Sequence, residues 1–228
     1  MRHHARRQPR TRQFDVLSGP QGASAQLAHR EDRELADTWT CHNGHMSPLQ
    51  LLARDVGVNE RTLRRAVTQG TLRASRPSPR KLEIPLTECQ YARRSWPIIS
   101  VLRSVFRTEH NVRFALLFGS FALGTDGPNS DIDVLVELRD PDLAHLIDLK
   151  TRLTDLVGRQ VDLVVLEQAK QEPFFLAQVL DEGRVLVDRD NRWHALRAQQ
   201  RRLRLRGARV DAQRITNALA GIDRVLER

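Results

Sequence analysis

Residues 114–137 read FALLFGSFALGTDGPNSDIDVLVE, and this stretch decides the fold. Its first five residues, 114–118, are all apolar, as expected of a strand that is buried on both faces. Gly119 follows, and a residue without a side chain lets the backbone approach a ligand closely. Ser120 offers a hydroxyl and a backbone N–H to phosphate oxygens. Residues 124–130 are dense in turn formers and close the loop before the next strand.

Two aspartates open the second strand, which is predicted over residues 131–137. In an extended strand, residues two apart face the same way, so Asp131 and Asp133 project together while Ile132 points into the core. Carboxylates this close repel one another unless a cation lies between them. Mg²⁺ accepts hard oxygen ligands of this kind and leaves room for phosphate oxygens.

A third acid, Asp162, lies in a later apolar run, residues 161–166, which predicts another strand. Residues 142–157 carry leucines at helical spacing and predict a helix between the two acidic strands. One interpretation is that the acids are merely solvated and that Gly119-Ser120 is an ordinary turn. The ordered set of strand, Gly-Ser, fixed gap, Asp-x-Asp and third Asp instead favours a two-metal site for phosphoryl transfer from a nucleoside triphosphate.

Residues 118–137 resemble the signature of the minimal nucleotidyltransferases of the DNA polymerase β superfamily, and the similarity runs from about residue 112 to 187. The resemblance implies an α/β (α+β) fold, with a mixed sheet flanked by helices. It also implies that Gly119 and Ser120 grip the triphosphate of ATP and that Asp131, Asp133 and Asp162 hold two Mg²⁺ ions. One departure is Leu123, where many members of the family carry a basic residue.

Minimal nucleotidyltransferases of this kind often act as antitoxins, so the resemblance implies a protein adenylyltransferase. The leading hypothesis is transfer of AMP from ATP to a tyrosine hydroxyl of a cognate HEPN-type ribonuclease toxin. Two alternatives stay open. One is adenylylation of a small molecule such as an aminoglycoside. The other is a transcriptional regulator in which the nucleotidyltransferase domain only senses nucleotide.

A second motif precedes the acidic one. Residues 49–67 read LQLLARDVGVNERTLRRAV and resemble the helix-turn-helix domains of bacterial regulators. Gly57 permits a left-handed turn between two helices, and Asn59 is a good N-cap for the second. That helix would present three arginines to operator DNA, with residues 73–84 as a basic wing or a linker. A helical module used only for packing or dimerisation is the alternative. The candidate DNA-binding residues are Arg61, Arg64 and Arg65.

These patterns divide the chain into four parts. Residues 1–45 lack an apolar period and predict a disordered extension, so translation could begin at Met46. Residues 46–95 form the small all-α helix-turn-helix domain and residues 96–190 the nucleotidyltransferase domain. A connecting helix in residues 85–107 is expected to start after a break at Trp96-Pro97. Residues 191–228 predict a basic helical region with a break near Gly207 and an apolar stripe suited to a protein partner, including a second copy of the chain.

Charge is segregated along the chain, although the formal net charge is +9. Residues 96–190 hold 16 acidic against 10 basic side chains, which suits cation capture, and the flanking segments are basic, which suits an anionic partner. No apolar run approaches the length of a membrane span. The two cysteines, Cys41 and Cys89, imply no disulfide framework. We therefore expect a cytoplasmic protein with no membrane partner.

Overall fold

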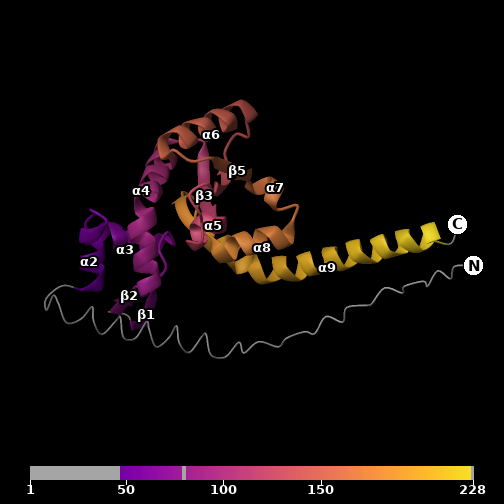
Figure 1. Cartoon of the computed structure of the whole chain (residues 1–228), viewed down its shortest axis with the longest axis horizontal. Helices are drawn as coiled ribbons and strands as arrows, with labels where there is room; N and C mark the ends of the chain where they lie inside the picture. The colour runs from indigo at the N-terminus through magenta and orange to yellow at the C-terminus, as the bar shows by residue number, and fades with distance from the viewer. Residues whose placement is uncertain (1–46, 79–80, 227–228) are drawn as a thin grey trace, which may run out of the picture. The chain divides into compact units, whose positions relative to one another are not determined.

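A mixed four-stranded sheet forms the centre of the computed structural model, which describes residues 47–78 and 81–226. The disorder predicted for residues 1–45 lies outside this range. The strand order is β5-β4-β3-β6, where β3 is antiparallel to both of its neighbours and β4 is parallel to β5. The predicted mixed sheet is confirmed (Figure 1). The strands are β3 (Val112–Phe118), β4 (Ile132–Leu138), β5 (Val161–Val165) and β6 (Arg184–Asp188).

Helices cover both faces of the sheet, so the alternating residues of the central strands are buried on either side. Helices α4 (Leu86–Thr108) and α6 (Leu143–Val157) pack on the face that carries Ile132 and Val134. Helices α8 (Pro173–Glu182) and α9 (Arg192–Leu226) pack on the face that carries Phe118 and Leu135. Two short helices, α5 (Gly119–Leu123) and α7 (Leu166–Ala169), directly follow β3 and β5.

The break expected at Trp96-Pro97 was wrong, because α4 runs without interruption through Pro97. Proline inside a helix removes one hydrogen bond and costs about 3 kcal/mol. Trp96 is 5% exposed, and Ile99 and Leu102 are fully buried against the sheet. Burying each such side chain contributes about 1.5–3 kcal/mol, so packing outweighs the lost bond.

The break expected near Gly207 was also wrong, because α9 is a single helix from Arg192 to Leu226. Gly207 is buried where α9 crosses α8, and a Cβ atom there would lie only 2.8 Å from the Cβ and backbone nitrogen of Phe174. Glycine at this position therefore serves close approach of the two helices rather than a change of direction. The residues before and after Gly207 therefore belong to one continuous helix.

The segment predicted as a helix pair forms α2 (Pro48–Asp55) and α3 (Glu60–Gln69). Ser47 makes a capping box with Gln50, and the Asn59 side chain accepts from the N–H of Thr62 at 2.8 Å, as predicted for the second N-cap. Gly57 has φ +70°, which confirms the left-handed turn. Between α3 and α4, strands β1 (Ser75–Ser78) and β2 (Lys81–Glu83) pair antiparallel.

Arg184 joins these helices to the sheet through a buried cluster of polar contacts. Its guanidinium pairs with both carboxylate oxygens of Glu88 in α4, and the two side chains are 3% and 6% exposed. Its Nε donates to the carbonyl oxygen of Ala122 at 2.6 Å, and its Nη1 donates to that of Thr71 at 3.3 Å. The Tyr91 ring lies 3.7 Å from the guanidinium carbon. Four hydrogen bonds and one stacked ring therefore compensate this buried cation.

The end of α3 also docks on the outer edge of β6. The Thr71 hydroxyl donates to the carbonyl of Val185 at 2.6 Å, and the Val185 N–H donates to the carbonyl of Gly70 at 3.1 Å. An edge strand otherwise leaves such groups without partners. The helix pair is thereby built into the same compact unit, Met46–Arg228, as the sheet.

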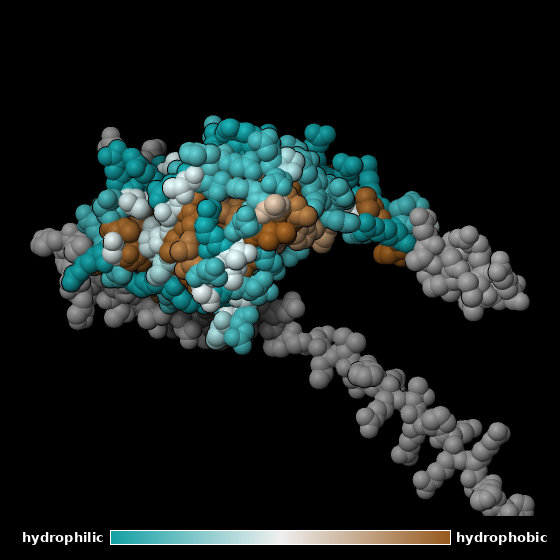
Figure 2. All heavy atoms as spheres, turned by 90° about the horizontal axis from the view of Figure 1, so that it is seen from above, coloured by the Kyte–Doolittle hydropathy of each residue, from teal (hydrophilic) through white to brown (hydrophobic). Residues whose placement is uncertain are grey.

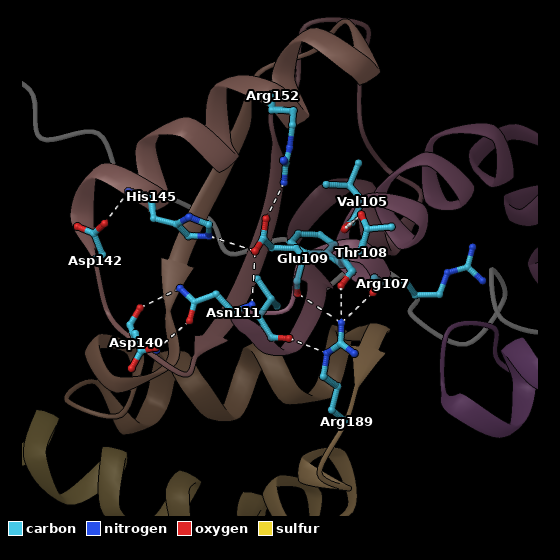
Figure 3. Close-up of polar contacts among 12 residues, drawn as sticks. Val105, Arg107, Thr108, Glu109, Asn111, Asp140, Asp142, His145, Arg152 and Arg189 are labelled. Carbon is cyan, nitrogen blue, oxygen red and sulfur yellow. Dashed lines mark hydrogen bonds and ion pairs between the residues drawn. The ribbon is translucent and has the colours of Figure 1, made fainter.

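A second polar network lies at the end of the sheet where the chain passes from α4 into β3 (Figure 3). Arg189 donates to the carbonyls of Arg107 and Val112, both at 2.9 Å, which caps the end of α4. Asn111 and the backbone of Asp140 exchange two hydrogen bonds of 2.9 and 2.8 Å. Burial opposes ionisation of Glu109, but the hydrogen bonds from Arg152 and the Asn111 N–H hold its pKa below the usual range.

The face shown in Figure 2 is mostly hydrophilic, with several hydrophobic areas across its middle. Among the described residues, no helix has both the length and the apolarity that crossing a bilayer requires. The exposed large apolar side chains are Leu123, Leu143, Ile147, Leu156, Phe174, Leu205 and Ile215.

The buried ion pair gives a stability prediction. Replacing Glu88→Gln leaves Arg184 buried without its counter-ion, so the free energy of unfolding should fall by about 3–5 kcal/mol. Urea unfolding at pH 7, followed by circular dichroism, measures this. The matched control is Glu60→Gln, which removes the exposed partner of Arg64 and should cost less than about 0.5 kcal/mol. Equal losses in the two variants would contradict the role given to the buried pair.

Candidate functional site

Gly119 ends β3 in a conformation that only glycine adopts readily, with φ +71°. A Cβ atom at this position would overlap a carboxylate oxygen of Asp133, which lies against the bare backbone. The register agrees, because Phe118 stands opposite Asp133 in the β3–β4 ladder. The absent side chain therefore makes room for the aspartate itself, beside the half-buried Ser120.

The parallel pairing of β4 and β5 sets Asp133 directly opposite Asp162. Their neighbours Ile132 and Val161 are fully buried in the core beneath α4 and α6, which confirms the predicted inward direction of Ile132. By alternation, both acids lie on the opposite face, the one that carries Leu135. Asp131 is exposed and directly precedes β4.

The three acids influence one another electrostatically. Burial, followed by the charges of Asp162 and Asp131, raises the pKa of Asp133 above its ordinary value. Raised carboxylate pKa values of this origin mark a concentration of negative charge that a cation would relieve. The site therefore has the donor chemistry of a hard divalent ion.

The third acid, Asp162, forms an ion pair with Lys150 of α6. The ammonium lies 2.6 Å from Asp162 Oδ1, and the lysine and aspartate side chains are 39% and 44% exposed. No three histidine, cysteine, aspartate or glutamate side chains in the described part of the chain form a ready-made metal group. Asp133 and Asp162 thus share one face of the sheet, and Asp162 is held toward the lysine. The sequence pattern used Lys150 only as a helix position, and its placement follows from α6 packing on β5.

The loop between the Gly-Ser turn and the acids is held by cations. Asp126 is 7% exposed and pairs with Arg94 of α4 and with Arg159, the latter at 2.9 Å. Arg159 also donates to the carbonyl of Ser130 at 3.1 Å and lies 5.1 Å from the ring centre of Phe121. These arginines are separated from the loop in sequence, so the sequence pattern did not find them.

Leu123, the departure from the family pattern, is 44% exposed at the end of α5. A basic group nevertheless lies next to it. An Nη atom of Arg94 is 3.6 Å from the position of a Cβ on Gly124, the residue after Leu123. The positive charge that the resemblance leads one to expect near this loop is therefore present, but it comes from α4.

The three candidate DNA-binding arginines lie on α3 and are exposed. Arg64 is held by Glu60, with its Nε 2.7 Å from the carboxylate. Arg61 and Arg65 form no ion pair among the residues that the structure describes. The charge of Arg64 is therefore partly neutralised by Glu60, whereas no such pair within the described chain neutralises Arg61 or Arg65.

With this geometry in place, the class of protein is defined. Residues 101–192 match the family described as "Polymerase beta, Nucleotidyltransferase". The chain is 36% identical over 92 residues to a putative protein adenylyltransferase of Methanocaldococcus jannaschii, which covers 39% of this chain and 89% of that protein. The chain belongs to this nucleotidyltransferase family, in which ATP and a divalent metal are used.

Two further relatives carry related names. Protein adenylyltransferase MntA of Thermococcus cleftensis is 34% identical over 74 residues, which is 32% of this chain and 75% of that protein. A second putative protein adenylyltransferase of M. jannaschii is 36% identical over 64 residues, or 28% of this chain. The chain spans 65% of the length of that relative.

Among solved structures, a toxin–antitoxin complex with AMP-PNP contains a similar chain, with 23% identity and a TM-score of 0.45 over 54% of this chain and 98% of that one. The complex of a tri-AMPylated Shewanella oneidensis HEPN toxin with the MNT antitoxin gives 20% identity and a TM-score of 0.43, over 55% and 98%.

The crowding of the acids predicts that, without metal, this site lowers the free energy of unfolding. Because the folded state raises the pKa of Asp133, its ionised form at pH 7 opposes folding, and this penalty fades as the pH falls. Asp133→Asn should therefore stabilise the metal-free protein at pH 7 and raise its melting temperature. Thermal melts in EDTA at pH 7 and pH 4 measure the effect.

The control for these melts is Asp155→Asn, an exposed acid on α6, which should change stability by less than about 0.5 kcal/mol. A destabilised Asp133→Asn protein at pH 7 would show that the carboxylate is not held against repulsion.

Proposed function

We propose that this protein is an Mg²⁺-dependent adenylyltransferase that transfers AMP from ATP to a hydroxyl of a partner protein, and that the acceptor is a tyrosine of a HEPN-type ribonuclease toxin. The protein would then be the antitoxin of the pair, acting in the cytoplasm. The observation that carries the proposal is the register that sets Asp133 opposite Asp162 beside Gly119, with Asp131 directly before the strand and its charge acting on Asp133.

The donor set suits the metal that this chemistry requires. Asp131 and Asp133 would hold Mg²⁺, and Asp162 would join them by exchanging its contact with Lys150. Two bound Mg²⁺ ions would supply charge neutralisation at the phosphates and at the attacking oxygen. Burial, and then the charges of Asp162 and Asp131, raise the pKa of Asp133, and the part due to these charges supports the proposal because a divalent ion would offset it.

The remaining steps fall to residues of the chain. The bare backbone at Gly119 and the Ser120 hydroxyl would bind the triphosphate. The tyrosine oxygen would attack the α-phosphorus while the bond to pyrophosphate breaks, and Asp162 would accept the tyrosine proton. Arg94 and Arg159 fix the loop that lines this site through Asp126, so they would act as positioning residues.

A protein acceptor is favoured by the openness of the site. Asp131 is exposed and the Asp162 side chain is nearly half exposed. A side chain of another folded protein can therefore reach the acids. Relatives that carry this domain are themselves named protein adenylyltransferases. The choice of a HEPN-type toxin follows the family resemblance of the signature.

Incubation of the full chain with the HEPN-type partner, Mg²⁺ and α-³²P-ATP tests the reaction. Label should move to the partner and be absent when its acceptor tyrosine is changed to phenylalanine. Asp131→Ala and Asp133→Ala should each lower the rate by more than about 100-fold, because metal affinity depends on these ligands. The matched control Asp155→Ala should keep the rate. Label that persists in the two site variants would sink the assignment.

We also propose that α2 and α3 form a helix-turn-helix that binds operator DNA, so that the protein regulates its own expression. The Asn59 cap, the left-handed Gly57 and the adjoining β1–β2 hairpin support this reading. On α3, Arg61 and Arg65 would contact the DNA, whereas Arg64 is partly neutralised by Glu60.

This inequality predicts a ranking among the arginines. Arg61→Ala and Arg65→Ala should each reduce the slope of log affinity against log salt by about 1, because each removes one phosphate contact. Arg64→Ala should change it less. Fluorescence anisotropy with the upstream duplex at several salt concentrations measures the slopes. If all three variants bind like the parent, α3 is a packing element only.

A further inference from the structure

The guanidinium of Arg103 is largely buried, and its side-chain hydrogen-bond partners carry no charge. On α4, it donates to the side-chain oxygen of Gln69 at 2.6 Å and to the hydroxyl of Thr71. In residues 47–78 and 81–226, no carboxylate pairs with it. Burial, and then the charge of Arg107, hold the pKa of Arg103 below its ordinary value. A buried charge without a counter-ion destabilises the folded protein, so an anion bound beside Arg103 would be stabilising.

A pocket of about 300 Å³ lies beside Arg103, bounded by the end of α3, by α4, by the edge strand β6 and by the start of α9. Arg107, one turn further along α4, also lines it. The Arg107 side chain extends away from the network around Glu109 (Figure 3), and its Nε donates to the carbonyl of Arg103 at 3.2 Å. Two guanidinium groups therefore serve one pocket.

One acid, Asp188, lines the pocket, and its carboxylate already accepts hydrogen bonds from the backbone. Asp188 accepts from the backbone N–H groups of Arg192 at 2.9 Å and of Trp193 at 3.1 Å, which caps the start of α9. Its charge is thus directed to the helix end, where a negative group is stabilised. The pocket is left with a positive balance from Arg103 and Arg107.

Two residues with ring side chains, Trp193 and His194, also line the pocket. A volume of about 300 Å³ exceeds the needs of inorganic phosphate and lies at the small end of the range for ligand pockets. We propose that this pocket is a second nucleotide site, which takes a nucleoside monophosphate with its phosphate on Arg103 and Arg107 and its base against Trp193. This site is separate from the proposed transfer reaction and does not rest on it.

Its position gives the ligand a structural consequence. The pocket is lined by Gln69 and Val185, and these adjoin the contacts that dock α3 on β6. A bound nucleotide would therefore stabilise the placement of the helix pair on the sheet. A duplex phosphate is a poorer fit, because Arg103 lies inside a concavity rather than on a projecting surface.

The test follows the indole N–H signal of Trp193 by NMR in the full chain, assigned with Trp193→Phe. AMP is added in EDTA, where the metal-dependent site lacks its ions. The signal should shift on titration, and Arg107→Ala should weaken AMP binding about tenfold, the effect of losing one charge-assisted hydrogen bond. Arg107 is exposed and its side chain donates only to the backbone, so this variant should fold. The matched control is Arg202→Ala, an exposed arginine on α9, which should bind AMP like the parent.

Three results would overturn the proposal. The Trp193 signal could stay unmoved by millimolar AMP, or the shift could survive Arg107→Ala undiminished. Inorganic phosphate alone could bind as tightly as AMP, which would remove the nucleotide from the argument. A shift with duplex DNA but not with AMP would make the two arginines DNA contacts instead.

Discussion

The buried pairing of Arg184 with Glu88 is the constraint on which the rest of the structure depends. A charge in this position is tolerated only if its donors are all occupied, and removal of one partner leaves the other uncompensated. The acceptors come from α4, from the end of α3 and, at Ala122, from the short helix that begins at Gly119. One guanidinium thus fixes the short helix that begins at Gly119 relative to the sheet edge.

Burial around this pair also affects its aromatic neighbour. Tyr91 packs its ring on the guanidinium, and burial raises the pKa of this tyrosine to about 12. The phenol therefore stays neutral at physiological pH, and its ring remains an apolar and electron-rich cover for Arg184. The cluster combines charge, hydrogen bonding and packing within one part of the core, and its members come from four separate elements.

The sheet face that carries Asp133 and Asp162 shows the opposite situation, because there like charges are held together without full compensation. The acids lie side by side through strand register, and the nearby cations hold the surroundings: Lys150 at Asp162, and Arg94 and Arg159 at Asp126. A site of this kind costs stability in the absence of its ligands, as is common where function requires a strained arrangement. The rigid frame around Arg184 allows the fold to carry that cost.

Strand β6 connects the parts of the protein that the proposals assign to different tasks. Its first residue is Arg184, its outer edge receives α3 at Val185, and its end at Asp188 caps α9. The helix pair, the proposed nucleotide pocket and the sheet that carries the acids therefore share one short strand.

The sequence by itself determined the features that obey local rules. Strand alternation turned Ile132 inward and Asp133 to the other face, and the special backbone of Gly57 and the cap at Asn59 followed from single-residue preferences. The mixed sheet was also predicted, through the family signature. These features depend on neighbours a few residues away, so a linear pattern can reveal them.

Only the tertiary structure decided the contacts between distant segments. Lys150 reaches Asp162 because α6 packs on β5, and Arg184 meets Glu88 across 96 residues of chain. The breaks expected at Pro97 and Gly207 failed for the same reason: local propensity is worth a few kcal/mol at most, and burial against the sheet or close helix contact exceeds it. Packing free energy is summed over the whole core, and no window of sequence contains that sum.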